Sequence, residues 1–276
     1  MFENVYGHAF QKETLISAIE KDRISHAYLF SGKSGIGKKM IALEFARNIL
    51  NTEDLKTCVD FKYVEKLEDK KEILVEQIRE NISDDVIERP ITGTKKVYVI
   101  DDANLLNISA QNALLKTIEE PPEYVVIILI ASNTSTLLPT ILSRVLRVDF
   151  NPLDYESVES YIEKNGIKID KNIIGFASGS IGVINEIISN NLVDKLKKVD
   201  EILEYMEKKD ISSSLLKVQE VDFNESFMLS YLQYLLFERK YFEASLEPER
   251  AINRLKMNGN YDIVIDNMII RCIERM

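Results

Sequence analysis

Two uninterrupted apolar runs constrain the fold of this chain more than any other feature of its sequence. Residues 97–100 read VYVI and run directly into Asp101 and Asp102, and residues 124–131 read YVVIILIA and end in Ser132-Asn133-Thr134. Runs without polar alternation are typical of strands in a parallel sheet, which helices cover on both faces. Ligands bind at the carboxyl edge of such open sheets. The sequence therefore predicts an α/β fold with polar groups gathered at one sheet edge.

The segment between the two runs is predicted to be helical. Leu114 and Ile118 lie one turn apart on the same helical face, and Pro121-Pro122 ends the helix because proline cannot continue its hydrogen-bond ladder. After the second run, a short element leads to Ser143-Arg144. A strand, a helix and a strand with polar groups at the strand ends form a layout typical of nucleotide sites.

Composition and charge restrict the classes of function. A net charge of −10 argues against a free-standing nucleic-acid binder, because such modules usually carry a basic surface. The two cysteines, Cys58 and Cys272, have no metal-like spacing and form no disulfide framework. The first residues, MFENVYGHAF, lack a basic start followed by an apolar core, and no apolar run reaches membrane-spanning length. We expect a cytoplasmic protein.

A glycine-rich loop follows the predicted strand 26–30 and precedes a predicted helix over 40–50. The loop reads SGKSGIGKK, and its residues Gly32, Gly35, Gly37 and Lys38 fit a phosphate-binding P-loop, in which backbone N–H groups surround an anion. Lys39 departs from the pattern, which has Ser or Thr there to help hold Mg²⁺. An ammonium cannot ligate a cation and repels one. An ordinary glycine turn is the alternative interpretation.

The paired carboxylates at the end of the first apolar run also allow two interpretations. Asp101 would orient Mg²⁺ through water, and Asp102 stands where hydrolysing proteins of this layout carry a water-activating Glu. The shorter side chain would lie about one methylene too far back, and misplacement of that size can cost orders of magnitude in rate. Alternatively, the two aspartates cap the next helix or pair with Lys38.

Several segments, taken in order, resemble the bacterial clamp-loader AAA+ family, and most closely its delta-prime type of DNA polymerase III subunit. They are HAYLFSGKSGIGK, EQIRE, KKVYVIDDANLLNISAQNALLKTIEEPP and LPTILSRV. The resemblance extends from about Val5 to about Ile188, and the rest of the chain contributes only a helical pattern. It implies a P-loop AAA+ domain with a parallel sheet, a small three-helix lid domain and a C-terminal helical collar domain.

The resemblance also implies roles for individual residues. Ser143-Arg144 matches the family's Ser-Arg-Cys motif, with Val145 in place of Cys, so Arg144 is expected to reach the ATP site of a neighbouring subunit. Asn133 matches the first sensor position. The second sensor is an arginine in the family, and Gly182 stands in its place. Without this resemblance, a loop arginine such as Arg144 would more simply form a surface ion pair.

The domain bounds implied by the resemblance are 1–151 for the AAA+ domain, 152–192 for the lid and 193–276 for the collar. Helices are predicted over 155–164, 171–178, 182–189, 227–244 and 261–273, another over 73–83, and residues 51–69 are predicted to be irregular. The apolar stripe of Ile265, Met268 and Cys272 could belong either to the core of the last domain or to a collar surface.

Lys39, Asp102 and Gly182 are departures at three positions that hydrolysis within one subunit requires. Together they resemble the delta-prime type, which assists its neighbour's ATPase without a working site of its own. We therefore expect no required cofactor, weak binding of ATP, ADP or phosphate at most, and no metal; Cys58 alone cannot build the four-cysteine zinc module of many relatives. The implied partners are gamma/tau and delta subunits, the sliding clamp and primer–template DNA, with no membrane.

Two other functions remain open at the level of sequence. One is an active clamp-loader ATPase of the gamma/tau type, which would show ATP turnover that depends on Lys38. The other is a small-molecule P-loop kinase, for which the sequence shows no arginine-rich lid or acceptor pocket and which would make the Ser143-Arg144 match accidental.

Overall fold

The computed structural model describes residues 1–223 and 226–276, and these form two compact units. Unit 1 comprises Met1–Gly166 and Gly179–Gly182, and unit 2 comprises Ile167–Ser178 and Val183–Met276. The three domains predicted from the sequence, with bounds at 151 and 192, stay a prediction. No helix of the described residues is long and apolar enough to cross a membrane.

Unit 1 contains a five-stranded parallel sheet with the strand order β2-β3-β4-β1-β5. The strands are β1 (Ala27–Ser31), β2 (Phe61–Val64), β3 (Lys96–Ile100), β4 (Val125–Ala131) and β5 (Leu146–Asp149). Every residue of β1, β3 and β4 is buried, because helices cover both faces of these three strands. The parallel α/β fold expected from the two apolar runs is confirmed.

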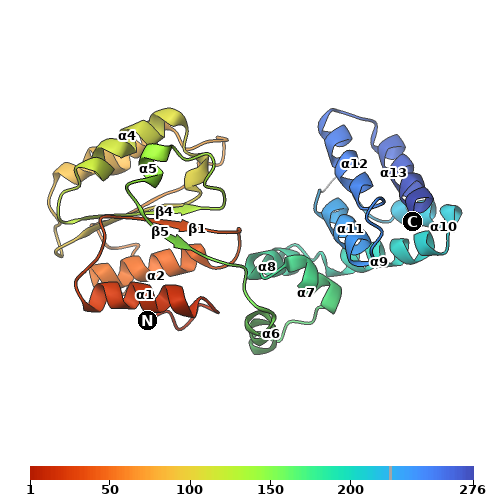
Figure 1. The fold of residues 1–276 in the computed structure, drawn as a ribbon, viewed down its shortest axis with the longest axis horizontal. Coiled ribbons are helices and arrows are strands. Elements are labelled where there is room, and N and C mark those ends of the chain that lie inside the picture. The colour runs from red at the N-terminus through yellow and green to blue at the C-terminus, as the bar shows by residue number, and fades with distance from the viewer. Residues whose placement is uncertain (224–225) are drawn as a thin grey trace. The chain divides into compact units, whose positions relative to one another are not determined.

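Helices pack on both faces of this sheet (Figure 1). One face contacts α1 (Ala9–Glu20) and α2 (Lys38–Leu50), whose apolar residues pack against Tyr28 and Phe30 of β1. The opposite face buries Ala27 and Leu29 against the other helices of the sheet domain. These are α3 (Val75–Ile78), η1 (Arg79–Ser83), η2 (Asp85–Ile87), η3 (Ala103–Leu105), α4 (Ile108–Glu119) and α5 (Pro139–Leu142). The alternation of neighbouring β1 residues follows from the two-residue period of a strand.

The structure of unit 1 departs from the sequence-based expectations in three places. The supposedly irregular segment 51–69 contains β2, and β5 was not predicted at all. Both are four-residue strands at the sheet edges, FKYV and LRVD, which are too short and too polar to form a continuous apolar run. The predicted helix over 73–83 is α-helical only in α3 and continues as the π-helix η1, where the Asp84 N–H reaches back to the Arg79 carbonyl at 2.9 Å.

Helix α6 (Tyr155–Lys164) belongs to unit 1, and every secondary-structure element described in unit 2 is a helix. Its helices are α7 (Lys171–Ala177), the part of α8 (Ile181–Ser189) beyond Gly182, α9 (Val193–Glu207), α10 (Ile211–Val218), α11 (Ser226–Glu238), α12 (Leu246–Lys256) and α13 (Tyr261–Arg275). The predicted helix 227–244 ends early because Lys240 adopts a left-handed conformation, and the Tyr241 N–H closes the end on the Leu236 carbonyl at 2.9 Å.

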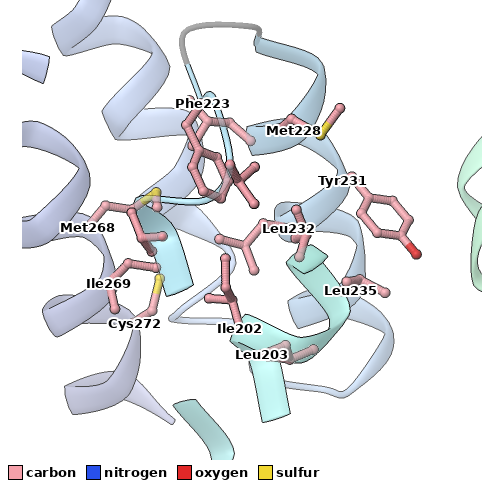
Figure 2. Close-up of a cluster of buried hydrophobic side chains, with 14 of the residues drawn as sticks. Ile202, Leu203, Phe223, Met228, Tyr231, Leu232, Leu235, Met268, Ile269 and Cys272 are labelled. Carbon is pink, nitrogen blue, oxygen red and sulfur yellow. The ribbon is translucent and has the colours of Figure 1, made fainter. Parts of the chain in front are cut away.

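The core of unit 2 forms where α9, α11 and α13 pack together (Figure 2). Figure 2 shows Phe223, Leu232 and Ile202 directed into this core. The stripe of Ile265, Met268 and Cys272 on α13 is buried there, with at most 2% of any of the three residues exposed. The structure therefore assigns this stripe to the core of unit 2.

Candidate functional site at the carboxyl edge of the sheet

The glycine-rich loop, residues 32–37, leaves the carboxyl end of β1 and leads into the first turn of α2. Its first residue, Gly32, lies close to Phe150, the residue that follows β5. A Cβ atom at Gly32 would lie 2.2 Å from the Phe150 carbonyl oxygen. Gly37 is the N-cap residue of α2, and among the described residues no side chain caps this helix. The exposed end of a helix carries unpaired N–H groups and partial positive charge, so this arrangement can hold an anion.

Every carbonyl oxygen of residues 32–36 accepts a hydrogen bond from a group in unit 1. The Lys38 ammonium donates to the first two, Gly32 at 2.5 Å and Lys33 at 2.6 Å. The next three are bonded by residues distant in sequence: Ser34 by Ser180 Oγ at 3.1 Å, Gly35 by the Gly182 N–H at 2.8 Å, and Ile36 by His8 Nε2 at 2.7 Å. The loop is thus fixed in shape from three directions.

Gly35 and Gly182 approach each other so closely that neither position has room for a side chain. A Cβ atom at Gly182 would lie 2.5 Å from the Gly35 Cα atom, and one at Gly35 would lie 2.2 Å from Ser180 Oγ. Gly35 also has a left-handed φ of 76°, which favours glycine. The structure therefore places Gly182 against the loop, and this position, which the family resemblance matches to the second-sensor arginine, has no room for a side chain.

Lys38 lies beneath the loop with only 6% of its surface exposed. Burial lowers the pKa of its ammonium, while the charges of Asp101 and Asp102 act in the opposite direction. His8, which holds the Ile36 carbonyl, also has a lowered pKa, chiefly because it is buried and also because Lys12 and Lys38 repel its protonated form. A neutral His8 with its proton on Nε2 is consistent with donation to the carbonyl.

Lys39 points toward the end of β3 and forms an ion pair with Asp101. Its Nζ lies 3.2 Å from Asp101 Oδ2, 3.8 Å from Glu65 and 4.7 Å from the centre of the Tyr63 ring. The Tyr63 hydroxyl, on the neighbouring strand β2, donates to the same Asp101 oxygen at 2.6 Å. The pKa of Tyr63 is raised by burial first and by its bond to Asp101 second. Asp101 Oδ2 is therefore shared between a cation and a hydroxyl of the same chain.

Asp102 adopts a left-handed conformation with φ of 47°, and its N–H donates to Asp101 Oδ1 at 3.0 Å. Its pKa is raised by burial and by the negative charge of Asp101, although Lys38 and Lys39 partly offset this effect. Among the described residues, no side chain caps the turn η3, so the capping alternative does not apply. The other alternative was an ion pair of these aspartates with Lys38. The structure shows an ion pair of Asp101, but its partner is Lys39.

Asn133 follows β4 at the same carboxyl edge and is exposed. Its side-chain oxygen accepts the Ser135 N–H at 2.9 Å within its own turn. The neighbouring Ser132 is held from across the edge, because its N–H donates to Asn104 Oδ1 at 3.0 Å. The strand order therefore brings the residues after β1, β3 and β4 to one edge.

Arg144 lies at the opposite edge of the sheet. It precedes β5, whose first residue Leu146 pairs in register with Tyr28 near the start of β1, so Arg144 is at the amino ends of the strands. Its Nη2 forms an ion pair with Glu119 Oε1 at 3.2 Å, and its Nη1 donates to the Thr140 carbonyl and to Ser143 Oγ, each at 3.1 Å. The side chain is 40% exposed. The structure does not bring Arg144 to the glycine-rich loop.

Sequence reasoning missed four residues that shape these sites: His8, Tyr63, Ser180 and Glu119. Glu119 lies in the TIEEPP run that carries part of the family resemblance, but nothing in the run indicated its partner. Ser180 stands in the Gly179–Gly182 segment, but a lone serine there gives no sequence signal for its contact with the Ser34 carbonyl. His8 and Tyr63 gave no sequence signal, because their contacts join segments far apart in the chain.

Comparisons with known proteins agree with this fold and these motifs. Residues 7–154 match the family described as DNA polymerase III, delta subunit. The DNA polymerase III subunit tau of Bacillus subtilis is 32% identical over 232 residues, 79% of this chain. The subunit delta' of the same species is 33% identical over 161 residues, 52% of this chain. The chain spans only 39% and 48% of the lengths of these two relatives.

A solved structure shares the fold over nearly the whole chain. The gamma subunit-related protein of DNA polymerase III from Thermotoga maritima is 21% identical, covers 96% of this chain and 99% of its own, and superposes with a TM-score of 0.60. The family match to residues 7–154 covers more than half of the 276 residues. The chain therefore belongs to the DNA polymerase III delta-subunit family, and with its tau and delta' relatives it is a member of the clamp-loader subunit family of that polymerase.

Proposed function

We propose that this chain is a delta-prime-like subunit of the bacterial replicative clamp loader, part of the DNA polymerase III holoenzyme, and that it hydrolyses no ATP itself. It supplies Arg144 as a trans-acting arginine finger to the ATP site of a neighbouring subunit, and so assists loading of the sliding clamp on primed DNA. The single observation that carries the proposal is the ion pair between Lys39 and Asp101, at 3.2 Å.

The ion pair opposes Mg²⁺ binding at the chain's own loop. Lys39 replaces the hydroxyl that would hold the ion, and its ammonium already occupies the Asp101 oxygen that would orient it. Two like charges about 4 Å apart repel by about 1 kcal/mol in water and by more in a partly dry site. Asp102 is one methylene shorter than Glu, so its carboxylate would lie too far back to activate a water efficiently.

The position of Arg144 supports a role toward another molecule. It lies at the amino edge of the sheet, whereas the glycine-rich loop lies at the carboxyl edge, so one chain cannot bring the two together. A guanidinium offers fixed paired donors that suit the charge developing on a transferred γ-phosphoryl group. The proposed partners are gamma/tau ATPase and delta subunits in a hetero-oligomeric ring, with the clamp and primer–template DNA reached through the complex.

We further propose that the chain acts in the cytoplasm and that its own glycine-rich loop binds nucleotide weakly at most. The loop retains an uncapped helix end and Lys38, so weak binding of ATP, ADP or phosphate is compatible with it. No cofactor and no zinc are required for a subunit that acts through Arg144. The degenerate nucleotide site then consists of the loop glycines with Lys38, Lys39, Asp101, Asp102 and Asn133.

The test combines the purified chain with a bacterial gamma/tau ATPase subunit, a delta subunit, the sliding clamp and primed DNA. We expect ATPase at background level for the isolated chain and stimulated ATPase in the mixture. Arg144→Ala should lower the stimulated kcat by about tenfold or more, as expected for loss of a finger, with assembly unchanged by gel filtration. Arg147→Ala is the matched control, because Arg147 is also an exposed arginine and pairs with Asp149 of its own strand. Unchanged stimulation by Arg144→Ala would refute the finger assignment.

A second candidate function, an active ATPase of the gamma/tau type, is favoured by one observation. The tau relative matches 79% of this chain, whereas the delta' relative matches 52%. An active enzyme would turn over ATP in isolation, and Lys38→Ala would abolish that turnover. Turnover that survives removal of Lys38 would indicate a contaminating enzyme and would support neither function.

A further inference from the structure

Unit 2 contains a cluster of three arginines around one buried carboxylate, at the contact between α12 and α13. Glu247, at the start of α12, is only 2% exposed. Arg250 of the same helix donates to Glu247 Oε1, and Arg275 Nη1 lies 3.3 Å from that oxygen. Arg271 Nη1 lies 4.0 Å from the other oxygen, Oε2. Arg271 and Arg275 are one helical turn apart and therefore share a face of α13.

The cluster holds more positive charge than a structural ion pair needs. One guanidinium suffices to neutralise Glu247, and the second and third leave a local charge of about +2. Among residues 1–223 and 226–276, no other carboxylate lies within 4.0 Å of these guanidiniums. Neighbouring like charges repel by about 1 kcal/mol or more at such separations. This excess stands out in a chain whose net charge is −10.

The three guanidiniums also have hydrogen-bond donors to spare. Each guanidinium carries five N–H groups in a fixed fork, whereas Glu247 offers two oxygens. The side chains of Arg250, Arg271 and Arg275 are 46%, 42% and 35% exposed, so their remaining donors are open to solvent. Glu247 is buried where α12 contacts α13, and its charge adds to the effect of burial in raising the pKa of the Cys272 thiol to about 12. The carboxylate therefore fixes where the three guanidiniums converge.

We propose that Arg250, Arg271 and Arg275 form a phosphate-binding site in unit 2, with Glu247 as the residue that positions them. Guanidinium forks match the oxygens of a phosphate group and bind them in pairs. A phosphate monoester carries a charge of about −1.5 to −2 at pH 7, which balances the excess charge of the cluster. The source of the phosphate is either a small phosphate compound or the backbone of a nucleic acid. The site is separate from the glycine-rich loop and does not rest on the proposed function.

The experiment uses the full chain carrying Lys38→Ala, so that the glycine-rich loop does not contribute phosphate binding. Calorimetric titration with inorganic phosphate at constant ionic strength should show one site, and Arg271→Gln should weaken it at least tenfold. Arg271 is chosen because it is the guanidinium farthest from Glu247, so Arg250 and Arg275 keep the buried carboxylate neutralised. Arg271→Lys, which keeps the charge but not the fork, should give an intermediate affinity. Arg254→Gln changes an exposed arginine of α12 outside the cluster; it is the control and should change the affinity less than twofold.

Two further titrations distinguish the sources of phosphate. A short single-stranded oligonucleotide is compared with the same oligonucleotide carrying a 5′-phosphate. Binding of inorganic phosphate, or stronger binding of the phosphorylated form, supports the site with a small or terminal phosphate as ligand. Equal binding of both oligonucleotides without binding of inorganic phosphate supports it with the nucleic-acid backbone as ligand, provided that Arg271→Gln weakens both. Absence of binding in all arms, or binding that Arg271→Gln leaves unchanged, would overturn the proposal.

Discussion

The contact between Gly35 and Gly182 makes the strongest prediction about the stability of unit 1. In Gly182→Ala, the new Cβ atom would meet the Gly35 Cα atom at 2.5 Å, about 0.9 Å closer than ordinary contact, which begins at 3.4 Å. Backbone lies on both sides of this contact, so no flexible side chain can move away. The loop must shift, and the hydrogen bond from the Gly182 N–H to the Gly35 carbonyl is strained or lost.

The magnitude follows from two contributions. Forcing an extra carbon into a packed contact costs about 1–3 kcal/mol, and a lost hydrogen bond costs about 1 kcal/mol. Since part of the strain is relieved when the loop moves, we expect a loss of about 2–3 kcal/mol in the free energy of unfolding. For a unit of this size, each kcal/mol lowers Tm by about 2–4 °C. The expected decrease in Tm of the unit 1 transition is therefore about 4–12 °C.

Differential scanning calorimetry measures this change, with Gly93→Ala as the matched control. Gly93 has no heavy atom within 4 Å of its ideal Cβ position, and its φ is not left-handed, so alanine there should shift Tm by less than about 1 °C. Hydrogen exchange over residues 32–38 should also accelerate in Gly182→Ala alone. A Tm for Gly182→Ala equal to that of Gly93→Ala would show that the two glycines do not support each other as described.

Two further predictions concern single carboxylates. Glu119→Ala should reduce the stimulated ATPase less than Arg144→Ala does, because the guanidinium loses one of its holding contacts, and Glu119→Gln should recover part of the loss. The stability of the chain should change little, since exposed ion pairs contribute about 0–1 kcal/mol. Glu120→Ala, which changes the adjacent exposed carboxylate, is the control. Equal effects of the two alanine variants on the stimulated ATPase would contradict the positioning role of Glu119. Burial favours the protonated form of Asp60, but hydrogen bonds from Thr92 and the Ile91 N–H outweigh it and lower the pKa below its ordinary 3.8. Asp60 should therefore stabilise unit 1 above about pH 4 and lose this contribution as pH falls. The free energy of unfolding in urea should then depend less on pH below about pH 4 for Asp60→Asn than for the wild type. An identical pH dependence of the two proteins would contradict this.

The sequence predicted the centre of the sheet well and its margins poorly. Strands β3 and β4 were recognised because burial on both faces requires a continuous apolar run, and this requirement can be read directly from residues 97–100 and 125–131. The edge strands β2 and β5 each pair with one strand only, and most of their residues are half-buried or exposed, so their four residues carry no such pattern. The end of α11 depended on the left-handed conformation of Lys240, a residue type that rarely adopts it.

The candidate site was predictable in its residues but not in its contacts. The glycine spacing placed Lys38 and Lys39 at the start of a helix, because a local pattern encodes a local turn. The ion pair of Lys39 with Asp101 and the pair of Arg144 with Glu119 join segments that only the folded sheet brings together. Such non-local partners leave no periodic pattern in a single sequence.

The hydrogen bonds to the five carbonyls of residues 32–36 have a consequence for signalling by nucleotide. A loop that senses its ligand needs two conformations of similar free energy, and the ligand must favour one of them. Here Lys38, Ser180, Gly182 and His8 already hold the single observed conformation, so an alternative would have to break several bonds at once. Binding or release of a ligand at the loop would therefore leave the conformation of the rest of unit 1 unchanged.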